Sequence, residues 1–158
     1  MSSPSFARWI GVLMVVLLDQ GLKWGAVHVL ESTWDCSLVF FTLTFVAHSN
    51  PGSVWGHLSH VPLFLLTVRF VVLMFLLAQW FRSDLPRREC IVWILCGAMS
   101  NLCDVYFYGA VIDFASLSLN TSLGLLSSPI FNLGDVCILI GMVRWMHYEW
   151  EKHQHQHL

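Results

Sequence analysis

Charged side chains are scarce in this chain, and their scarcity excludes most soluble folds. Only 11% of the 158 residues are Asp, Glu, Lys or Arg, whereas 56% are hydrophobic. A soluble domain carries about 25% charged residues. The formal net charge of −2 provides no basic surface for nucleic acid. The composition therefore predicts an integral membrane protein that forms one domain over residues 1–158.

Lys and Arg are absent from two long stretches, residues 31–60 and residues 113–130. Outside the apolar segments, the others gather near the termini and between the second and third apolar segments: Arg8, Arg82, Arg87, Arg88 and Lys152. Arg144 lies near the same side, at the end of the fourth apolar segment. Positive residues concentrate on the cytoplasmic side of membrane proteins. We therefore expect both termini to be cytoplasmic and both long connections to lie on the outer face.

Familiar catalytic and metal-binding patterns are also missing. The five Cys residues include no CxxC pair, which argues against a thiol relay and leaves them as packing residues. No HExxH, GxSxG or phosphate-binding glycine loop occurs. His48, His57 and His60 share one connection, but their spacing matches no familiar ligand set. We therefore expect no metal site.

Four apolar segments suit membrane-spanning helices, which need about 20 mostly apolar residues. The predicted spans are roughly 9–30, 61–81, 91–112 and 130–146, of which the last is short. The predicted fold is an all-α membrane protein with four transmembrane helices. The last connection, FASLSLNTSLGLLSSP, contains Ser and Gly and is uncharged.

The connection at 31–60 is rich in β-branched and aromatic residues. This composition predicts short strands that lie on the lipid headgroups and form a small β-structured cradle on the outer face. The candidate membrane anchors are Trp34, Phe40, Phe41 and Trp55. A cover at this position would admit a substrate sideways from the membrane and limit water.

Polar residues inside the spans converge on one layer of the membrane. Asp19 and Lys23 are four residues apart, so they share a helix face and can pair. A rise of 1.5 Å per residue places the polar residues of every span in the outer half of the membrane. These residues are Asp19, Lys23, Arg69, Asn101, Asp104, Asn132 and Asp135. Helix-to-helix hydrogen bonding could explain single cases, but convergence from all four spans favours a functional site.

Two carboxylates lie at the mouths of apolar segments, Asp113 in VIDF and Asp135 in FNLGD. On a continuous helix Asp113 would face away from Asp104, but Gly109 permits a break between them. Asp113 could then swing back and face Asp135. Two close carboxylates share a proton and supply a base and an acid together, without a Ser or Cys nucleophile.

Together these motifs resemble those of the lipoprotein signal peptidase (signal peptidase II) family, bacterial aspartic peptidases of the cytoplasmic membrane. The matching stretches, in family order, are LDQGLKW, NPGSVWG, GAMSNLCDVYFYGAVIDF and FNLGD. The resemblance implies that Asp113 and Asp135 are the catalytic dyad, and that Asp19 and Lys23 are the family's first-span pair. The residues implied to line the site are Asn50, Gly97, Asn101 and Asn132.

The resemblance also implies an activity. Members of the family cut prolipoproteins before a diacylglyceryl-modified cysteine and release the signal peptide. They need no metal or other cofactor, and globomycin inhibits them. We also expect an enzyme of the bacterial inner membrane, and we expect it to be a monomer. Its active site would face the periplasm, and its partners would be prolipoproteins and membrane lipid.

The chain departs from the family pattern at several positions. The family's Gly-Asn-x-x-Asp-Arg reads SNLCDV here, with Ser100 for Gly and Val105 for Arg, and Gly134 replaces Ala. One alternative is therefore a relative that binds lipidated or helical segments without cutting them. A second is a membrane redox or haem protein on a four-helix bundle, although paired mid-span His residues are missing.

The absent family arginine leaves Asp104 in need of a partner. An unpaired charge in a membrane costs about 2.5–3.5 kcal/mol on insertion scales. Arg69 lies at nearly the same depth, so we predict that Arg69 pairs with Asp104, directly or through water. Lys23 is the second candidate for this role. We also predict that Asn50 points toward the dyad.

Overall fold

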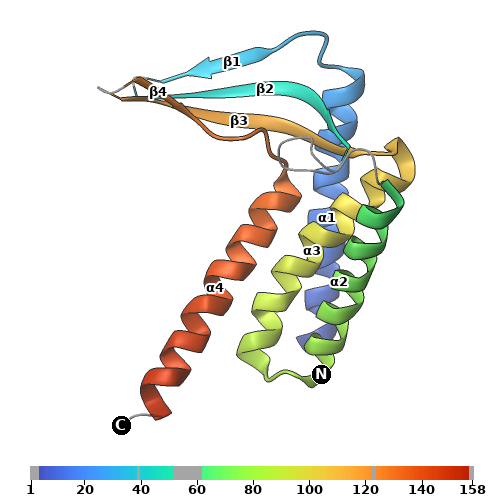
Figure 1. The fold of residues 1–158 in the computed structure, drawn as a ribbon, viewed down its shortest axis with the longest axis vertical. Helices are drawn as coiled ribbons and strands as arrows, with labels where there is room; N and C mark the ends of the chain where they lie inside the picture. The colour runs from blue at the N-terminus through green and yellow to red at the C-terminus, as the bar shows by residue number, and fades with distance from the viewer. Residues whose placement is uncertain (1–3, 39, 52–61, 122–123, 157–158) are drawn as a thin grey trace.

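The computed structural model describes residues 4–38, 40–51, 62–121 and 124–156. Within these residues, four helices form a bundle, and a four-stranded sheet projects across one end of it (Figure 1). The helices are α1 (Pro4–His28), α2 (Pro62–Arg82), α3 (Leu85–Tyr108) and α4 (Leu133–Gln156). The strands are β1 (Trp34–Ser37), β2 (Phe41–Asn50), β3 (Val111–Thr121) and β4 (Gly124–Ser127). The start of α1 and the end of α4 both lie at the end of the bundle away from the sheet.

Three of the described helices are long and apolar enough to cross a membrane, over Trp9–His28, Phe64–Arg82 and Leu85–Tyr108. The prediction of four helices is confirmed, and the composition supports membrane crossing for three of them. α4 has sufficient length but carries Arg144 and Glu149 among its apolar residues. That α4 also crosses the membrane stays a prediction.

Local sequence signals determine where α3 begins and ends. Asp84 caps its N-terminus by accepting a hydrogen bond from the Arg87 N–H, and Pro86 occupies the first turn. Gly109 ends the helix in a left-handed conformation with φ of 75°, and its N–H donates to the Val105 carbonyl. Such a cap favours glycine because it has no Cβ. The predicted break at Gly109 is confirmed, whereas the predicted extension of the third span to residue 112 is wrong.

The sheet is assembled from two parts of the chain that α2 and α3 separate. Its strands run in the order β1-β2-β3-β4, and all neighbouring pairs are antiparallel. The predicted strands within residues 31–60 are confirmed by β1 and β2, while residues 52–61 lie outside the described part. β3 and β4 were not predicted. Their signal is the alternation of apolar and polar residues in ASLSLN, which has the period of a strand.

One face of the sheet is apolar and the other is polar. Directly opposed residues share a face, and three such pairs are Phe41 with Leu119, Leu43 with Leu117, and Phe45 with Ala115. The residues of the opposite face include Asp35, Ser37, Thr42, Thr44, Ser116 and Ser118. Trp34, Phe40 and Phe41 are exposed, as expected for membrane anchors, and Trp55 lies outside the described residues. This amphipathic sheet suits a membrane surface.

α3 packs closely against both α2 and α4. An apolar cluster that includes Leu76, Trp80 and Leu95 fills the contact between α2 and α3. On the side of α4, a Cβ atom at Gly97 would lie only 2.0 Å from the Gly134 carbonyl oxygen. Any larger residue at position 97 would therefore push α4 away from α3 and move the first turn of α4.

Candidate active site

Lys23 lies at the centre of a fully buried ion cluster between α1 and α3. Its ammonium group is 2.7 Å from Asp19 Oδ2 and 2.7 Å from Asp104 Oδ2, and all three side chains are 0% exposed. The predicted pairing of Asp19 with Lys23 is confirmed. Burial of charges at this depth is tolerated because opposite charges and hydrogen-bond donors surround them.

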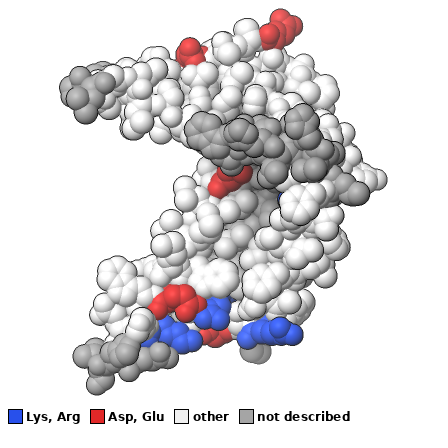
Figure 2. Space-filling view, in the orientation of Figure 1, with Lys and Arg blue, Asp and Glu red and all other residues white. Residues whose placement is uncertain are grey.

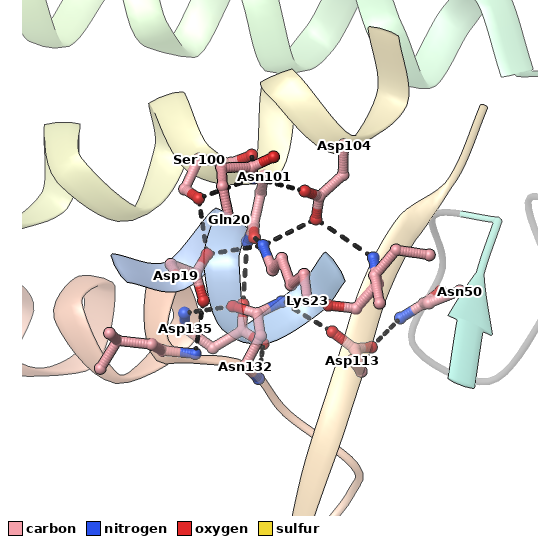
Figure 3. Close-up of polar contacts among 12 residues, drawn as sticks. Asp19, Gln20, Lys23, Asn50, Ser100, Asn101, Asp104, Asp113, Asn132 and Asp135 are labelled. Carbon is pink, nitrogen blue, oxygen red and sulfur yellow. Dashed lines mark hydrogen bonds and ion pairs between the residues drawn. The ribbon is translucent and has the colours of Figure 1, made fainter. Parts of the chain in front are cut away.

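Additional donors complete the shell around the two carboxylates of this cluster (Figure 3). Ser100 Oγ donates to Asp19 over 2.5 Å, and Gln20 Nε2 donates to Asp104 over 2.6 Å. The Ile112 N–H also donates to Asp104, over 3.1 Å. No role was predicted for Gln20 or for the Ser100 hydroxyl. The position of Ser100 four residues before Asp104, on the same face of α3, was an available signal.

The predicted direct pairing of Arg69 with Asp104 is wrong. Within the described residues, the cation paired with Asp104 is Lys23, the second candidate. Lys23, Gln20 and the Ile112 N–H surround both oxygens of the Asp104 carboxylate, and Arg69 forms no ion pair with it within 4.0 Å. Arg69 lies half-buried on α2. Its contact with Asp104 through water stays a prediction.

Asp113 lies on β3, near the end of the sheet that joins the helices. Its side chain is buried, with 3% of the residue exposed. Asn50 at the end of β2 donates from Nδ2 to Asp113 Oδ2 over 3.0 Å, and Asn132 Nδ2 donates to Oδ1 over 2.7 Å. Figure 3 shows the two amides on opposite sides of the carboxylate. The predicted placement of Asn50 beside Asp113 is confirmed.

Asp135 is fixed by the start of α4. Asn132 Oδ1 accepts from the Asp135 N–H over 2.8 Å, and Asp135 Oδ2 accepts from the Asn132 N–H over 3.1 Å. This reciprocal arrangement is a capping box, in which two side chains satisfy backbone N–H groups of a helix N-terminus. Asn132 therefore contacts both Asp113 and Asp135. It joins the two aspartates that the sequence motifs singled out.

Asn101 connects the ion cluster to Asp135. Its Oδ1 accepts from Lys23 Nζ over 2.9 Å, and its Nδ2 donates to Asp135 Oδ1 over 3.0 Å. Because an ammonium group can only donate, Lys23 fixes which end of the Asn101 amide faces Asp135. The Asp135 N–H fixes the Asn132 amide in the same way. Each aspartate thus receives an amide donor whose orientation is set by another group.

Gly97, which was predicted to line the site, lies against the α4 backbone. Its close neighbours are the Gly134 carbonyl and Ile138. Gly97 therefore acts on the site through the approach of α4, which carries Asp135 in its first turn. The structure brings the other predicted residues into one network: Asp19, Lys23, Asn50, Asn101, Asp104, Asp113, Asn132 and Asp135.

Burial raises the pKa of Asp113, and the negative charge of Asp135 raises it further. The hydrogen bonds from Asn50 and Asn132 and the charge of Lys23 oppose this shift. Within the described part of the chain, neither Asp113 nor Asp135 forms an ion pair. A carboxylate in this setting can hold or release a proton, which suits acid–base chemistry.

The site lies at the inner end of a deep hollow beneath the projecting sheet. Figure 2 shows acidic atoms at this point, and it shows Lys and Arg side chains gathered at the opposite end of the molecule. No group of three or more His, Cys, Asp or Glu residues that could hold a metal ion occurs in the described ranges. His48 is exposed, and His57 and His60 lie outside these ranges.

The sequence model of the family described as signal peptidase (SPase) II matches residues 11–150 of this chain. The chain belongs to the signal peptidase II family. A lipoprotein signal peptidase of Bartonella bacilliformis is 32% identical over 143 residues, which are 87% of this chain and 84% of the relative. One from Halalkalibacterium halodurans is 30% identical over 137 residues, 85% of each chain. Membership in the signal peptidase II family identifies the chain as a membrane peptidase.

Two solved structures, each described as a bacterial membrane enzyme, share the fold of this signal peptidase II family member. One is 23% identical with a TM-score of 0.76, covering 92% of this chain and 88% of its own. The other is 24% identical with a TM-score of 0.73, covering 90% of this chain and 91% of its own. The bundle with its projecting sheet is therefore a fold that known membrane enzymes also adopt.

Proposed function

We propose that this protein is an aspartic endopeptidase that removes the signal peptide from diacylglyceryl-modified prolipoproteins. Asp113 and Asp135 are its catalytic dyad. The observation that carries this proposal is their shared contact with Asn132 in the absence of any ion pair to either, within the described residues. The curated relatives, which are named lipoprotein signal peptidases, supply the substrate class.

In the proposed reaction one aspartate is ionised and the other is protonated. The ionised carboxylate takes a proton from a water molecule, whose oxygen attacks the carbonyl carbon before the lipidated cysteine. The protonated carboxyl gives its proton to the carbonyl oxygen. When the tetrahedral intermediate collapses, the carbon–nitrogen bond breaks and the cysteine nitrogen receives a proton. The raised pKa of Asp113 favours this residue as the member that starts protonated.

The charge distribution supports an orientation of the protein in the membrane. Arg82, Arg87 and Arg88 lie around the turn between α2 and α3, at the end away from the sheet. By the positive-inside rule this end is cytoplasmic, so the sheet lies on the periplasmic face of the inner membrane. The apolar face of the sheet would rest on lipid, and substrate would enter the hollow sideways from the membrane.

A cleavage assay tests the proposal. Purified protein in detergent should cut a synthetic peptide that carries a diacylglyceryl cysteine, and globomycin should block the cut. Asp113→Asn and Asp135→Asn should each lower kcat/KM by at least about 10²–10⁴-fold, the usual contribution of one proton-transfer group. Asp35→Asn is the matched control, because Asp35 is an exposed carboxylate of the same sheet. Near-normal turnover by either dyad variant would refute the assignment.

A second candidate function is binding of lipidated segments without cleavage. Val105, at the position of the family arginine, is the observation that favours it. The same assay separates the two functions. A protein that retains the diacylglyceryl peptide on a size-exclusion column but leaves it intact would be a binding protein and not a peptidase.

A further inference from the structure

Strand β2 carries one extra residue beside the candidate active site, and this residue changes which of its side chains face Asp113. Phe45 on β2 lies opposite Ala115 on β3. The next pair joins His48 with Asp113, so β2 advances by three residues where β3 advances by two. Such a bulge re-aims the side chains that follow it, and bulges are common next to active sites. In an unbroken strand, the alternation from Phe45 would turn the two neighbours of His48 toward this face. The bulge turns His48 and Asn50 there instead.

His48 therefore shares one face of the sheet with Asn50 and Asp113. Directly opposed residues of antiparallel strands have Cβ atoms about 4.5–5.5 Å apart, and this spacing applies to His48 and Asp113. Asn50, two residues further along β2, donates to Asp113 Oδ2 over 3.0 Å, so side chains on this face of β2 reach the site. Asp113 is buried, whereas His48 is exposed. His48 thus lies at the open rim of the site.

The His48 side chain has no use in the structure itself. Within the described part of the chain, no hydrogen bond or ion pair involves its imidazole ring. Beyond His48, toward the tip of the sheet, the described β2 and β3 residues on this face are apolar: Phe45 with Ala115, Leu43 with Leu117, and Phe41 with Leu119. An imidazole ring can both donate and accept a hydrogen bond, and a peptide bond offers one N–H and one C=O. His48 is therefore suited to bind a peptide backbone at the border between the aspartates and the apolar face.

The orientation of the protein indicates which peptide bond can reach His48. Under the proposed function the signal peptide lies in the membrane beside the helices, so the chain after the cysteine leaves the dyad toward the periplasmic sheet. An extended chain advances about 3.3 Å per residue. The spacing of about 4.5–5.5 Å between His48 and Asp113 therefore corresponds to one or two residues beyond the bond that is cut. A backbone N–H or C=O left unpaired at this point, beneath the sheet, would weaken binding.

We propose that His48 binds the peptide bond that follows the lipidated cysteine of the substrate. The inference rests on the proposed function and adds to it a substrate-binding residue on the side of the released lipoprotein. The imidazole ring accepts a hydrogen bond from the N–H of this peptide bond or donates one to its C=O. The contact is the same before and during the reaction, so its loss should raise KM and leave kcat nearly unchanged.

Removal of the polar ring atoms tests this assignment. His48→Phe keeps an aromatic ring without a donor or an acceptor, and we expect KM to rise about threefold to tenfold, the range for one hydrogen bond. His48→Gln keeps a donor and an acceptor and should retain most of the affinity. Ser49→Ala is the matched control, because Ser49 is exposed on β2 and faces away from Asp113. An unaltered KM in His48→Phe would overturn the assignment.

A modified substrate identifies the peptide bond that His48 contacts. An ester in place of the amide after the cysteine removes the N–H and weakens the C=O as an acceptor. With the unaltered protein, this ester should raise KM about as much as His48→Phe does. The His48→Phe variant should show no further loss with the ester, because the contact is already absent. An equal ester penalty in the two proteins would show that His48 does not bind this bond.

NMR of protein that carries isotope-labelled histidine gives a readout that does not depend on cleavage. The ring signals of His48 are identified by their absence in His48→Gln, and they should shift when an uncleavable diacylglyceryl peptide is added. Cleavage of the normal substrate without such a shift would overturn this inference and leave the proposed function intact. A shift without any cleavage would refute the proposed function and support the contact of His48 with the peptide.

Discussion

Two pairs of aspartates share one network, but their surroundings differ. Asp19 and Asp104 both contact the Lys23 ammonium group, and all three side chains are fully buried. Asp113 and Asp135 instead receive uncharged amide donors from Asn50, Asn101 and Asn132. The first pair is bound by a cation. Among the described residues, no cation pairs with either member of the second pair.

Under the proposed function, this difference would let one bundle supply carboxylates for two purposes. A carboxylate beside a cation is a poor general acid, because the cation favours its ionised form. A buried carboxylate with only amide donors keeps a proton more readily. The contact from Lys23 through Asn101 to Asp135 joins the two pairs, so the ion cluster can orient the dyad without neutralising it.

Among the variants compared, loss of the Lys23 ammonium group should lower stability the most. Lys23→Met would leave Asp19 and Asp104 buried without their cation, and breaking a buried ion pair costs about 3–5 kcal/mol. We expect a large fall in the melting temperature in detergent, measured by intrinsic fluorescence. Arg69→Met is the matched control, because Arg69 is a half-buried cation with no ion pair to Asp104 among the described contacts. Equal losses in the two variants would contradict the assignment of Lys23.

The same Asp→Asn substitution should act differently in the two pairs. In Asp104→Asn, an NH₂ group must face one of the donors Gln20, Lys23 or the Ile112 N–H, and an unsatisfied buried group costs about 1–3 kcal/mol. In Asp113→Asn an NH₂ group also faces a donor, Asn50 or Asn132, but this change removes a carboxylate whose charged form burial disfavours. Asp113→Asn should therefore abolish cleavage with a smaller loss of stability. Both variants are compared by thermal unfolding and by the cleavage assay. An active Asp104→Asn variant of unchanged stability would erase the distinction between the pairs.

The pH dependence of stability sharpens this prediction. Burial raises the pKa of Asp113, so the folded protein binds this proton more tightly than the unfolded chain does. Stability from this residue is present below the unfolded pKa and is lost as pH rises through the folded pKa. The Asp113→Asn variant has no carboxyl group at this position, so it does not lose this stability as pH rises. Its melting temperature relative to the unaltered protein should therefore be more favourable at neutral pH than at acidic pH.

Asn101, whose hydrogen bonds join the Lys23 cluster to Asp135, should affect the catalytic rate more than the stability of the fold. Asn101→Ala removes the donor to Asp135 and the acceptor for Lys23 while the ion cluster itself remains. We expect kcat to fall about tenfold to hundredfold, as is typical when a reacting group is misplaced by about 1 Å. The melting temperature should fall less than in Lys23→Met. An Asn101→Ala enzyme with normal kcat would show that the ion cluster does not position the dyad.

The smallest effect is expected for Asn50→Ala, as a shift in the pH dependence of kcat/KM. The hydrogen bond from Asn50 lowers the pKa of Asp113, so Asn50→Ala should raise that pKa further. If Asp113 is the proton donor, the alkaline limb of kcat/KM moves to higher pH, with a modest loss at the optimum. Asn120→Ala, on the exposed end of β3, is the control and should leave the profile unchanged. A shift toward lower pH would contradict Asp113 as the donor.

Much of the fold could be predicted because apolar runs and strong local signals determine it. The break at Gly109 follows from the conformational freedom of glycine, and it alone determines that Asp113 leaves the helix. The strands β3 and β4 were not predicted, because a short uncharged Ser- and Gly-containing segment is also typical of a connection, although the alternation in ASLSLN has the period of a strand. Pairing of β2 with β3 joins distant segments, and no local pattern specifies such a partner.

Most of the polar residues that the structure brings together could be predicted from the sequence, but not all their contacts. Depth along the membrane normal follows from counting residues, so Asp19, Lys23 and Asp104 were correctly placed in one layer. The choice of Lys23 over Arg69 as the partner of Asp104 depends on how each helix is rotated about its axis. Rotation is set by packing of neighbouring helices, which a residue count does not contain.

The central pair of strands also dictates an order of assembly. β2 can pair with β3 only after α2 and α3, which separate them in the chain, have been made and inserted. The three segments that bring Asn50, Asp113 and Asp135 together then meet last. During synthesis the edge of β2 stays unpaired, and the carboxylates are not yet opposed. The proposed peptidase would therefore become active only when its last helix has been made and its segments have come together.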